Sequence, residues 1–255
     1  MARSLTSNAL FETFDGKFLH LLISIFVVLL LYGILANVHM GRIIVELSFS
    51  LMLLLSVRAI RGKKNIVFTA IILFCLVVIL RWSAEFSNRN FLLLCSNILT
   101  AINLFVIVAA ILKNILTVND VMINDVYGAI CVYLLIGIIF AFIFYSSQMI
   151  DPQSFFYLRN IPSSHALALP EFIYLSFITL TSVGFGDISP VSTMAKTLTY
   201  MEAVIGQIYV IVLIARIVSL YVSNVANKRK PPPPHHQHIR HNRENPSTIT
   251  TSARY

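Results

Sequence analysis

The chain has 255 residues, of which 57% are hydrophobic and only 12% are charged, and its mean hydropathy is +0.81. This composition excludes an ordinary soluble domain, in which about a quarter of the residues are charged. The sequence therefore predicts an integral membrane protein. The net charge of +8 does not require nucleic acid as a partner, because anionic lipid headgroups attract the same side chains.

Apolar runs recur along the chain, each close to the length that crosses a hydrocarbon core of about 30 Å. They lie at residues 18–36, 43–57, 66–82, 91–112, 126–145 and 194–222. The second and third runs are short, so tilt or local membrane thinning must make up the difference. We therefore expect an all-α membrane protein with six transmembrane helices.

Basic residues are distributed unequally between the two sides of this arrangement. With the N-terminus inside, the cytoplasmic side has fourteen: Arg3, Lys17, Arg58, Arg61, Lys63, Lys64, Lys113, Arg216, Lys228, Arg229, Lys230, Arg240, Arg243 and Arg254. The opposite side has five: Arg42, Arg81, Arg89, Arg159 and Lys196. By the positive-inside rule both termini are expected in the cytoplasm. The expected location is the cell membrane, of the bacterial inner-membrane type, in a multi-pass arrangement.

Between the fifth and sixth runs, residues 179–187 read Thr-Leu-Thr-Ser-Val-Gly-Phe-Gly-Asp. Gly184 and Gly186 permit positive φ angles, so that consecutive carbonyls can turn to one side of the chain. Pro170 and Glu171 favour the start of a helix, and the apolar stretch that follows is too short to span a membrane. Irregular backbone at membrane depth is tolerated where it lines a cavity or is buried in protein. We expect a re-entrant pore helix and loop rather than an external turn.

This motif and its surroundings, over about residues 126–222, resemble the pore module of the potassium channel family. The resemblance implies an outer helix, a pore helix, a selectivity filter and an inner helix. It also implies that K⁺ binds at the backbone carbonyls of Ser182, Val183, Gly184 and Phe185, with Gly186 completing the filter. We call residues 182–186 the filter loop. Ser182 keeps a hydroxyl where Thr is usual, and Phe185 replaces the usual Tyr. No cofactor is expected beyond the permeant ion.

The resemblance and the residues together suggest roles around the filter loop. Asp187 is expected at the outer mouth, where a ring of carboxylates would concentrate cations, although it could also be a solvated turn residue. Some family members back this aspartate with a pore-helix glutamate, whose position is Ile178 here, so that this pairing is absent. Glu202 is a carboxyl within an apolar run, which is costly. We expect it to support the filter from behind, with Thr179 or Thr181 as its hydrogen-bond partner.

The inner helix has features of a gate. Gly206 follows Gly186 by twenty residues, which is the family's spacing for a hinge glycine, although a glycine also allows close helix packing. Four apolar residues recur beyond it at every fourth position and could form an inner constriction or simply pack: Val210, Ile214, Val218 and Val222. Arg216 is expected to reach lipid phosphates.

The first four apolar runs resemble the layout of six-helix channels but lack a voltage sensor. Such a sensor needs several arginines in its fourth helix, and residues 91–112 contain no charge. Their polar residues form one helical stripe that is expected to hydrogen-bond to neighbouring helices: Ser96, Asn97, Thr100 and Asn103. Voltage sensing of the usual kind is not expected.

Four regions are therefore expected. Residues 1–17 form a cytoplasmic segment, 18–112 a four-helix membrane domain, 126–222 the pore domain, and 223–255 a disordered basic tail rich in Pro and His. The proline run at 231–234 is a stiff spacer or a docking ligand for a cytoplasmic partner. The tail histidines could bind a metal or belong to disordered chain: His235, His236, His238 and His241.

The leading hypothesis is a potassium-selective, voltage-insensitive channel. It would be a homotetramer in membrane lipid, because one loop supplies only a quarter of each carbonyl ring. A non-selective cation channel and a non-conducting regulatory subunit with a channel-like fold are the alternatives. An enzyme is not expected, because the apolar runs lack paired catalytic carboxylates and His/Cys clusters.

Overall fold

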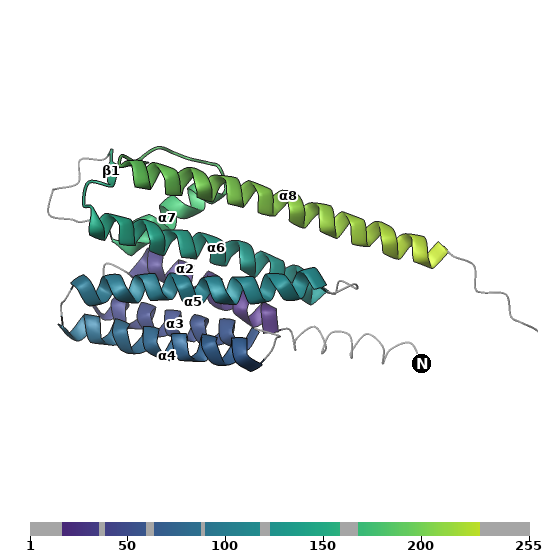
Figure 1. Cartoon of the computed structure of the whole chain (residues 1–255), viewed down its shortest axis with the longest axis horizontal. Coiled ribbons are helices and arrows are strands. Elements are labelled where there is room, and N and C mark those ends of the chain that lie inside the picture. The colour runs from purple at the N-terminus through teal and green to yellow at the C-terminus, as the bar shows by residue number, and fades with distance from the viewer. Residues whose placement is uncertain are drawn as a thin grey trace, which may run out of the picture.

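The computed structural model describes residues 17–35, 39–59, 64–87, 90–117, 123–158 and 168–229. Its helices are α2 (Lys17–Leu35), α3 (His39–Ala59), α4 (Lys64–Ser87), α5 (Asn90–Thr117), α6 (Ile123–Ile150), α7 (Leu169–Leu180) and α8 (Thr193–Arg229). Two short strands, β1 (Phe155–Tyr157) and β2 (Ile188–Pro190), flank α7 in the chain. The helices α2 to α5 lie side by side, α6 and α8 run obliquely to them in a similar direction, and the short α7 lies near one end of α6 and α8 (Figure 1).

Five helices in the described part of the chain are long and apolar enough to cross a membrane. They are α2, α4, α5, α6 and α8, with candidate spans at Lys17–Leu35, Lys64–Ala84, Asn90–Leu116, Asn124–Ile150 and Thr193–Arg216. The predicted all-α membrane fold is confirmed. The remaining predicted span, residues 43–57, corresponds to α3, which has 21 residues but contains Glu46 and Arg58 and is not among these five. Its crossing of the membrane stays a prediction.

One hydrophobic core joins the first helices to the outer helix α6. Its fully buried aromatic side chains include Phe18 of α2, Phe49 of α3 and Phe142 of α6. The rings of Phe49 and Phe142 are 5.4 Å apart. The predicted four-helix domain and the predicted pore domain are therefore packed against each other through α6.

Arg81 lies at the end of the third apolar run, and its expected position on the outer side stays a prediction. Its side chain is buried within α4 and forms an ion pair with Glu46 of α3. It also donates to the hydroxyl of Tyr32 at 3.2 Å, and its guanidinium carbon lies 5.1 Å from the ring centre of Phe49 and 5.7 Å from that of Phe142. The charge of Arg81, at the end of an apolar run, is thus stabilised by partners on three other helices, α2, α3 and α6.

The polar stripe of α5 is buried but only partly bonds to other helices. Ser96 and Thr100 donate to carbonyls of their own helix. The amide of Asn97 donates to the sulfur of Met149 on α6 at 3.6 Å. Among the described residues, neither amide atom of Asn103 has a hydrogen-bond partner. The predicted bonding between helices is thus seen for Asn97.

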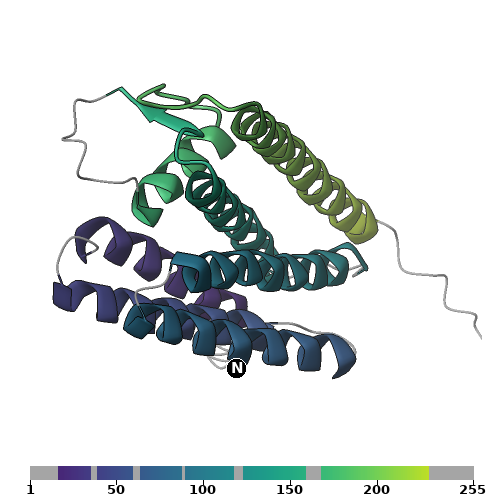
Figure 2. The same ribbon diagram turned by 60° about the vertical axis from the view of Figure 1, so that its left-hand side comes forward.

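The two strands were not predicted, because three residues are too few to show a clear alternating pattern. They pair antiparallel, with Phe155 opposite Pro190 and Tyr157 opposite Ile188. Phe155 also packs on Phe172 of α7, with ring centres 5.2 Å apart. The small sheet and α7 gather at one end of α6 and α8 (Figure 2). This pairing ties the segment after the filter loop to the end of the outer helix.

Candidate functional site

The pore helix α7 begins and ends where the sequence predicts. Pro170 lies in its first turn, and the Glu171 carboxylate accepts a hydrogen bond from the Ala168 N–H at 3.1 Å, which satisfies a backbone donor at the helix start. At the other end, the carbonyl of Ile178 accepts hydrogen bonds from the N–H groups of Val183 at 2.8 Å and Gly184 at 3.1 Å. The last turn of α7 therefore holds the filter loop directly.

The filter loop has an alternating backbone. The φ angles of Ser182, Gly184 and Gly186 are +59°, +52° and +77°, whereas Val183 and Phe185 have no positive φ. Positive φ was predicted for the two glycines, and Ser182 adopts it as well despite the cost to a residue with a Cβ. Alternation of this kind turns consecutive carbonyls to one side, where they can act together as ligands for a cation.

One side of the filter loop is uncovered in a single chain. The side chain of Val183 is 54% exposed and that of Phe185 is 70% exposed. A Cβ placed on Gly184 or Gly186 meets no atom within 4 Å. The loop therefore has room along this side for further groups.

Comparison with known proteins agrees with this geometry. Residues 129–223 match a family model described as "Ion channel". Over these residues the chain is similar to an ion channel, and we call them the channel-like region. The match begins in α6, includes α7 and the filter loop, and ends in α8, so that α2 to α5 lie outside it. No curated protein and no solved structure matches the chain.

Within the channel-like region, a residue that was not predicted from the sequence contacts Asp187. The hydroxyl of Tyr174 on α7 donates to its carboxylate at 2.9 Å. From the sequence, only the position of Ile178 was considered for a pore-helix partner of Asp187. Tyr174 lies one turn earlier on the same face of that helix.

Glu202 lies behind the pore helix, but its predicted partner is wrong. The carboxyl is fully buried and contacts the hydroxyl of Ser176 on α7, whereas Thr181 donates to its own helix at 2.6 Å. The Ser176 hydroxyl also lies 2.6 Å from the carbonyl oxygen of Gly137 on α6. Ser176 was missed because it sits inside the apolar run of α7. Its side chain joins three helices of the channel-like region, α6, α7 and α8, at one point.

These contacts indicate the protonation state of Glu202. A serine hydroxyl has a single proton to donate, and Ser176 faces two acceptors, the Gly137 carbonyl and Glu202 Oε1. Both contacts are favourable when Ser176 donates to Gly137 and a protonated Glu202 donates to Ser176. The other oxygen, Oε2, has no partner among the described residues, and an ionised carboxylate would be costly there.

This arrangement predicts different effects for two substitutions of Glu202. Glu202→Gln should retain most of the thermal stability of the purified protein, because an amide N–H can donate to Ser176. Glu202→Ala leaves a buried cavity and should cost roughly 2–4 kcal/mol. Thermal unfolding in detergent measures both, and infrared difference spectra should show a protonated carboxyl band that Glu202→Gln removes. Equal destabilisation by Gln and Ala would contradict the neutral assignment.

Gly206 is a point of close contact between the inner helix and the pore helix. A Cβ at this position would lie 2.6 Å from the carbonyl oxygen of Leu180 and 2.9 Å from its Cδ1. Tyr133 of α6 donates to the same carbonyl at 3.2 Å. The helix α8 continues through Gly206 without a break. The structure thus supports the packing role, and bending at Gly206 stays a prediction.

The residue after Gly206 also reaches the filter loop. The side-chain amide of Gln207 donates from Nε2 to the hydroxyl oxygen of Ser182 at 2.8 Å. The sequence reading did not single out Gln207. Its polar side chain, directly after the candidate hinge in a mostly apolar stretch, was the sequence feature that could have identified it.

The predicted apolar stripe of α8 beyond Gly206 is largely uncovered where its side chains are described. Ile214 and Val218 are exposed, Val210 is half-buried, and the side chain of Val222 lies outside the described residues. Arg216 was expected to reach lipid, but its guanidinium donates to the carbonyls of Ile115 and Leu116. That prediction is wrong because the last turn of α5 leaves carbonyls without helical partners, and these attract a cation.

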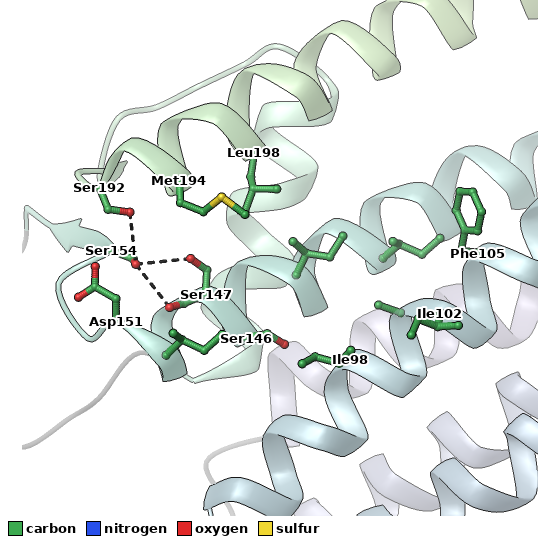
Figure 3. A pocket seen from close by; sticks show the side chains of 14 residues that line it. Ile98, Ile102, Phe105, Ser146, Ser147, Asp151, Ser154, Ser192, Met194 and Leu198 are labelled. Carbon is green, nitrogen blue, oxygen red and sulfur yellow. Dashed lines mark hydrogen bonds between the residues drawn. The ribbon is translucent and has the colours of Figure 1, made fainter.

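A cavity of about 670 Å³ lies away from these residues, between α5, α6 and the start of α8. Its walls are apolar, with Ile98, Ile102 and Phe105 facing Met194 and Leu198 (Figure 3). At one end Ser154 joins Ser147 and Ser192 through hydrogen bonds of 3.4 Å. None of the predicted filter or gate residues lines the cavity, so it is not part of the proposed ion path.

Proposed function

We propose that this protein is a potassium-selective channel. The observation that carries the proposal is the alternating backbone of the filter loop, with positive φ at Ser182, Gly184 and Gly186, held by the Ile178 carbonyl at the end of α7. In such a loop the carbonyls of residues 182–185 replace the water that K⁺ sheds. The binding groups belong to the backbone, so the absence of a hydroxyl on Phe185 removes a support and no ligand. No cofactor is required beyond the permeant ion.

The proposed assembly is a homotetramer around one central pore. A cation on the pore axis needs carbonyls on all sides, and one chain supplies a single loop. The filter loop is exposed in the single chain, Val183 and Phe185 included, which leaves room around it for the other three chains. Four Asp187 carboxylates would then form a ring at the outer mouth, each braced by Tyr174.

The proposed channel does not sense voltage. Moving one elementary charge through the membrane field is worth about 2.3 kcal/mol per 100 mV, so a sensor needs several mobile charges. Residues 91–112 of α5 have none. The buried Arg81 of α4 is held in place by its ion pair with Glu46 and by two aromatic rings.

The proposal extends to the setting of the channel. The chain lies in a cell membrane, of the bacterial inner-membrane type, with lipids around it and with both termini in the cytoplasm. The proline-rich tail is the proposed contact for a cytoplasmic partner. Residues 223–229, which were expected to be disordered, belong to α8, and residues 230–255 lie outside the described residues.

A non-selective cation channel is the second candidate. The ring of Phe185 is 70% exposed and has no hydroxyl to tie it to the pore helix. A filter held less firmly could admit Na⁺ as well as K⁺.

Reconstitution of the full chain in liposomes and planar bilayers tests these proposals. We expect flux of K⁺ far above that of Na⁺, a reversal potential near that of K⁺ under bi-ionic conditions, and little change in open probability between about −100 and +100 mV. Mass measurement of the active protein in detergent should give a tetramer. Equal passage of both ions would favour the non-selective channel, and no flux beyond that of empty liposomes would favour a non-conducting subunit.

A further inference from the structure

Two polar side chains meet at the first residue of the filter loop, one from the loop and one from the inner helix. Gln207 Nε2 lies 2.8 Å from Ser182 Oγ, and both residues are exposed in the single chain. Neither is part of the hydrophobic core. Their contact is therefore on the side of the loop that is open to ions and water.

The position of Gln207 depends on the glycine before it. Gly206 lets α8 approach so closely that a Cβ there would lie 2.6 Å from the Leu180 carbonyl oxygen. That approach brings the next residue of the helix within reach of Ser182. A side chain at position 206 would hold α8 further from the loop.

Ser182 has a specific need for such a partner. Its φ of +59° is costly for a residue with a Cβ, by about 1–2 kcal/mol. Its hydroxyl oxygen has two lone pairs and one proton. When one lone pair accepts the N–H of Gln207, the Ser182 side chain is held in one orientation, and its second lone pair stays available to a cation.

We propose that Gln207 is a positioning residue that holds the Ser182 hydroxyl as a ligand of the innermost cation site. The ligand is a partly dehydrated monovalent cation of the size of K⁺. This inference rests on the proposed channel function and adds to it a residue of the inner helix that determines how tightly the inner site binds. The alternative is that Gln207 merely bonds to the nearest polar group and has no influence on ion binding.

A double-mutant cycle on the full-length protein separates these readings. The variants are Ser182→Ala, Gln207→Leu and both together, and the probe is block by internal Ba²⁺, an ion close to K⁺ in size with twice its charge. We expect each single variant to weaken the block about tenfold, and the double variant to weaken it about tenfold as well, because both changes remove the same positioned ligand. The preference for K⁺ over Na⁺ should be largely retained.

The matched control is Gln153→Leu, which changes an exposed glutamine remote from the filter loop and should leave Ba²⁺ block unchanged. Gln207→Asn keeps the amide on a shorter side chain and should also weaken the block. This variant guards against misfolding of Gln207→Leu, and the mass of each variant in detergent checks its assembly.

Additive effects, with a loss of about a hundredfold in the double variant, would overturn the proposal. So would a Gln207→Leu variant that assembles and is blocked like the parent. A parent protein that conducts no cations would overturn the proposed function and this inference together, whereas a conducting parent with an additive cycle would overturn the inference alone.

Discussion

Gly184→Asp is expected to abolish selective cation flux through the reconstituted protein. The φ of Gly184 is +52°, which costs a residue with a Cβ about 1–2 kcal/mol in each copy. In the proposed tetramer, four carboxylates would also enter the rings of carbonyls and disturb the sites where K⁺ sheds its water. The effect does not depend on a clash within the chain, because a Cβ at Gly184 meets no atom within 4 Å.

The measurement is the flux of K⁺ and Na⁺ into liposomes that contain the variant. Gly184→Ala is the matched control, since it introduces the φ cost without the charge and should retain part of the flux. Mass in detergent and thermal unfolding should show that both variants assemble and fold. A Gly184→Asp protein that conducts K⁺ as selectively as the parent would exclude the filter loop as the ion path.

The features that were predicted correctly from the sequence depend on neighbouring residues in the chain and not on tertiary packing. Pro170 and Glu171 indicate a helix start regardless of what the helix packs against, and both lie in the first turn of α7. The two glycines of the filter loop indicate positive φ, and both have it. Helix lengths follow from runs of apolar residues, which is why five of the expected spans appear with nearly the predicted bounds.

Side-chain partners could not be predicted in the same way, because they depend on how each helix is rotated against its neighbours. Glu202 was recognised as a costly carboxyl, but three residues of α7 could have faced it, and the structure selects Ser176. Arg216 and Arg81 both bind groups on other helices, whereas the sequence predicted lipid contact for Arg216 and named no partner for Arg81. The side-chain contacts around the filter loop can therefore be identified only from the tertiary structure.

Gly206→Ala is the second substitution with a large expected effect, and its sign is informative. In an exposed helix interior, replacing Gly by Ala stabilises the helix by about 1 kcal/mol. At Gly206 the new Cβ would lie 2.6 Å from the Leu180 carbonyl oxygen, so α7 or α8 must shift, and overpacking of this kind costs about 1–3 kcal/mol. We therefore expect a lower unfolding temperature for the purified protein.

Gly33→Ala is the matched control, because Gly33 lies in α2 and a Cβ there meets no atom within 4 Å. It should leave the unfolding temperature unchanged or raise it slightly. An equal loss at both positions would show that the cost at Gly206 does not come from the contact with Leu180.

Single-channel recordings of Gly206→Ala distinguish the two roles considered for this glycine. Leu180 directly precedes Thr181 and the filter loop, and Gln207 contacts Ser182, so a shift of α8 at Gly206 moves both supports of the innermost site. A packing role therefore predicts a changed unitary conductance. A hinge role predicts fewer openings of unchanged size, because the filter would stay in place while bending of the inner helix becomes harder. Since the contact between Gly206 and Leu180 lies next to the filter loop, we expect the unitary conductance to change.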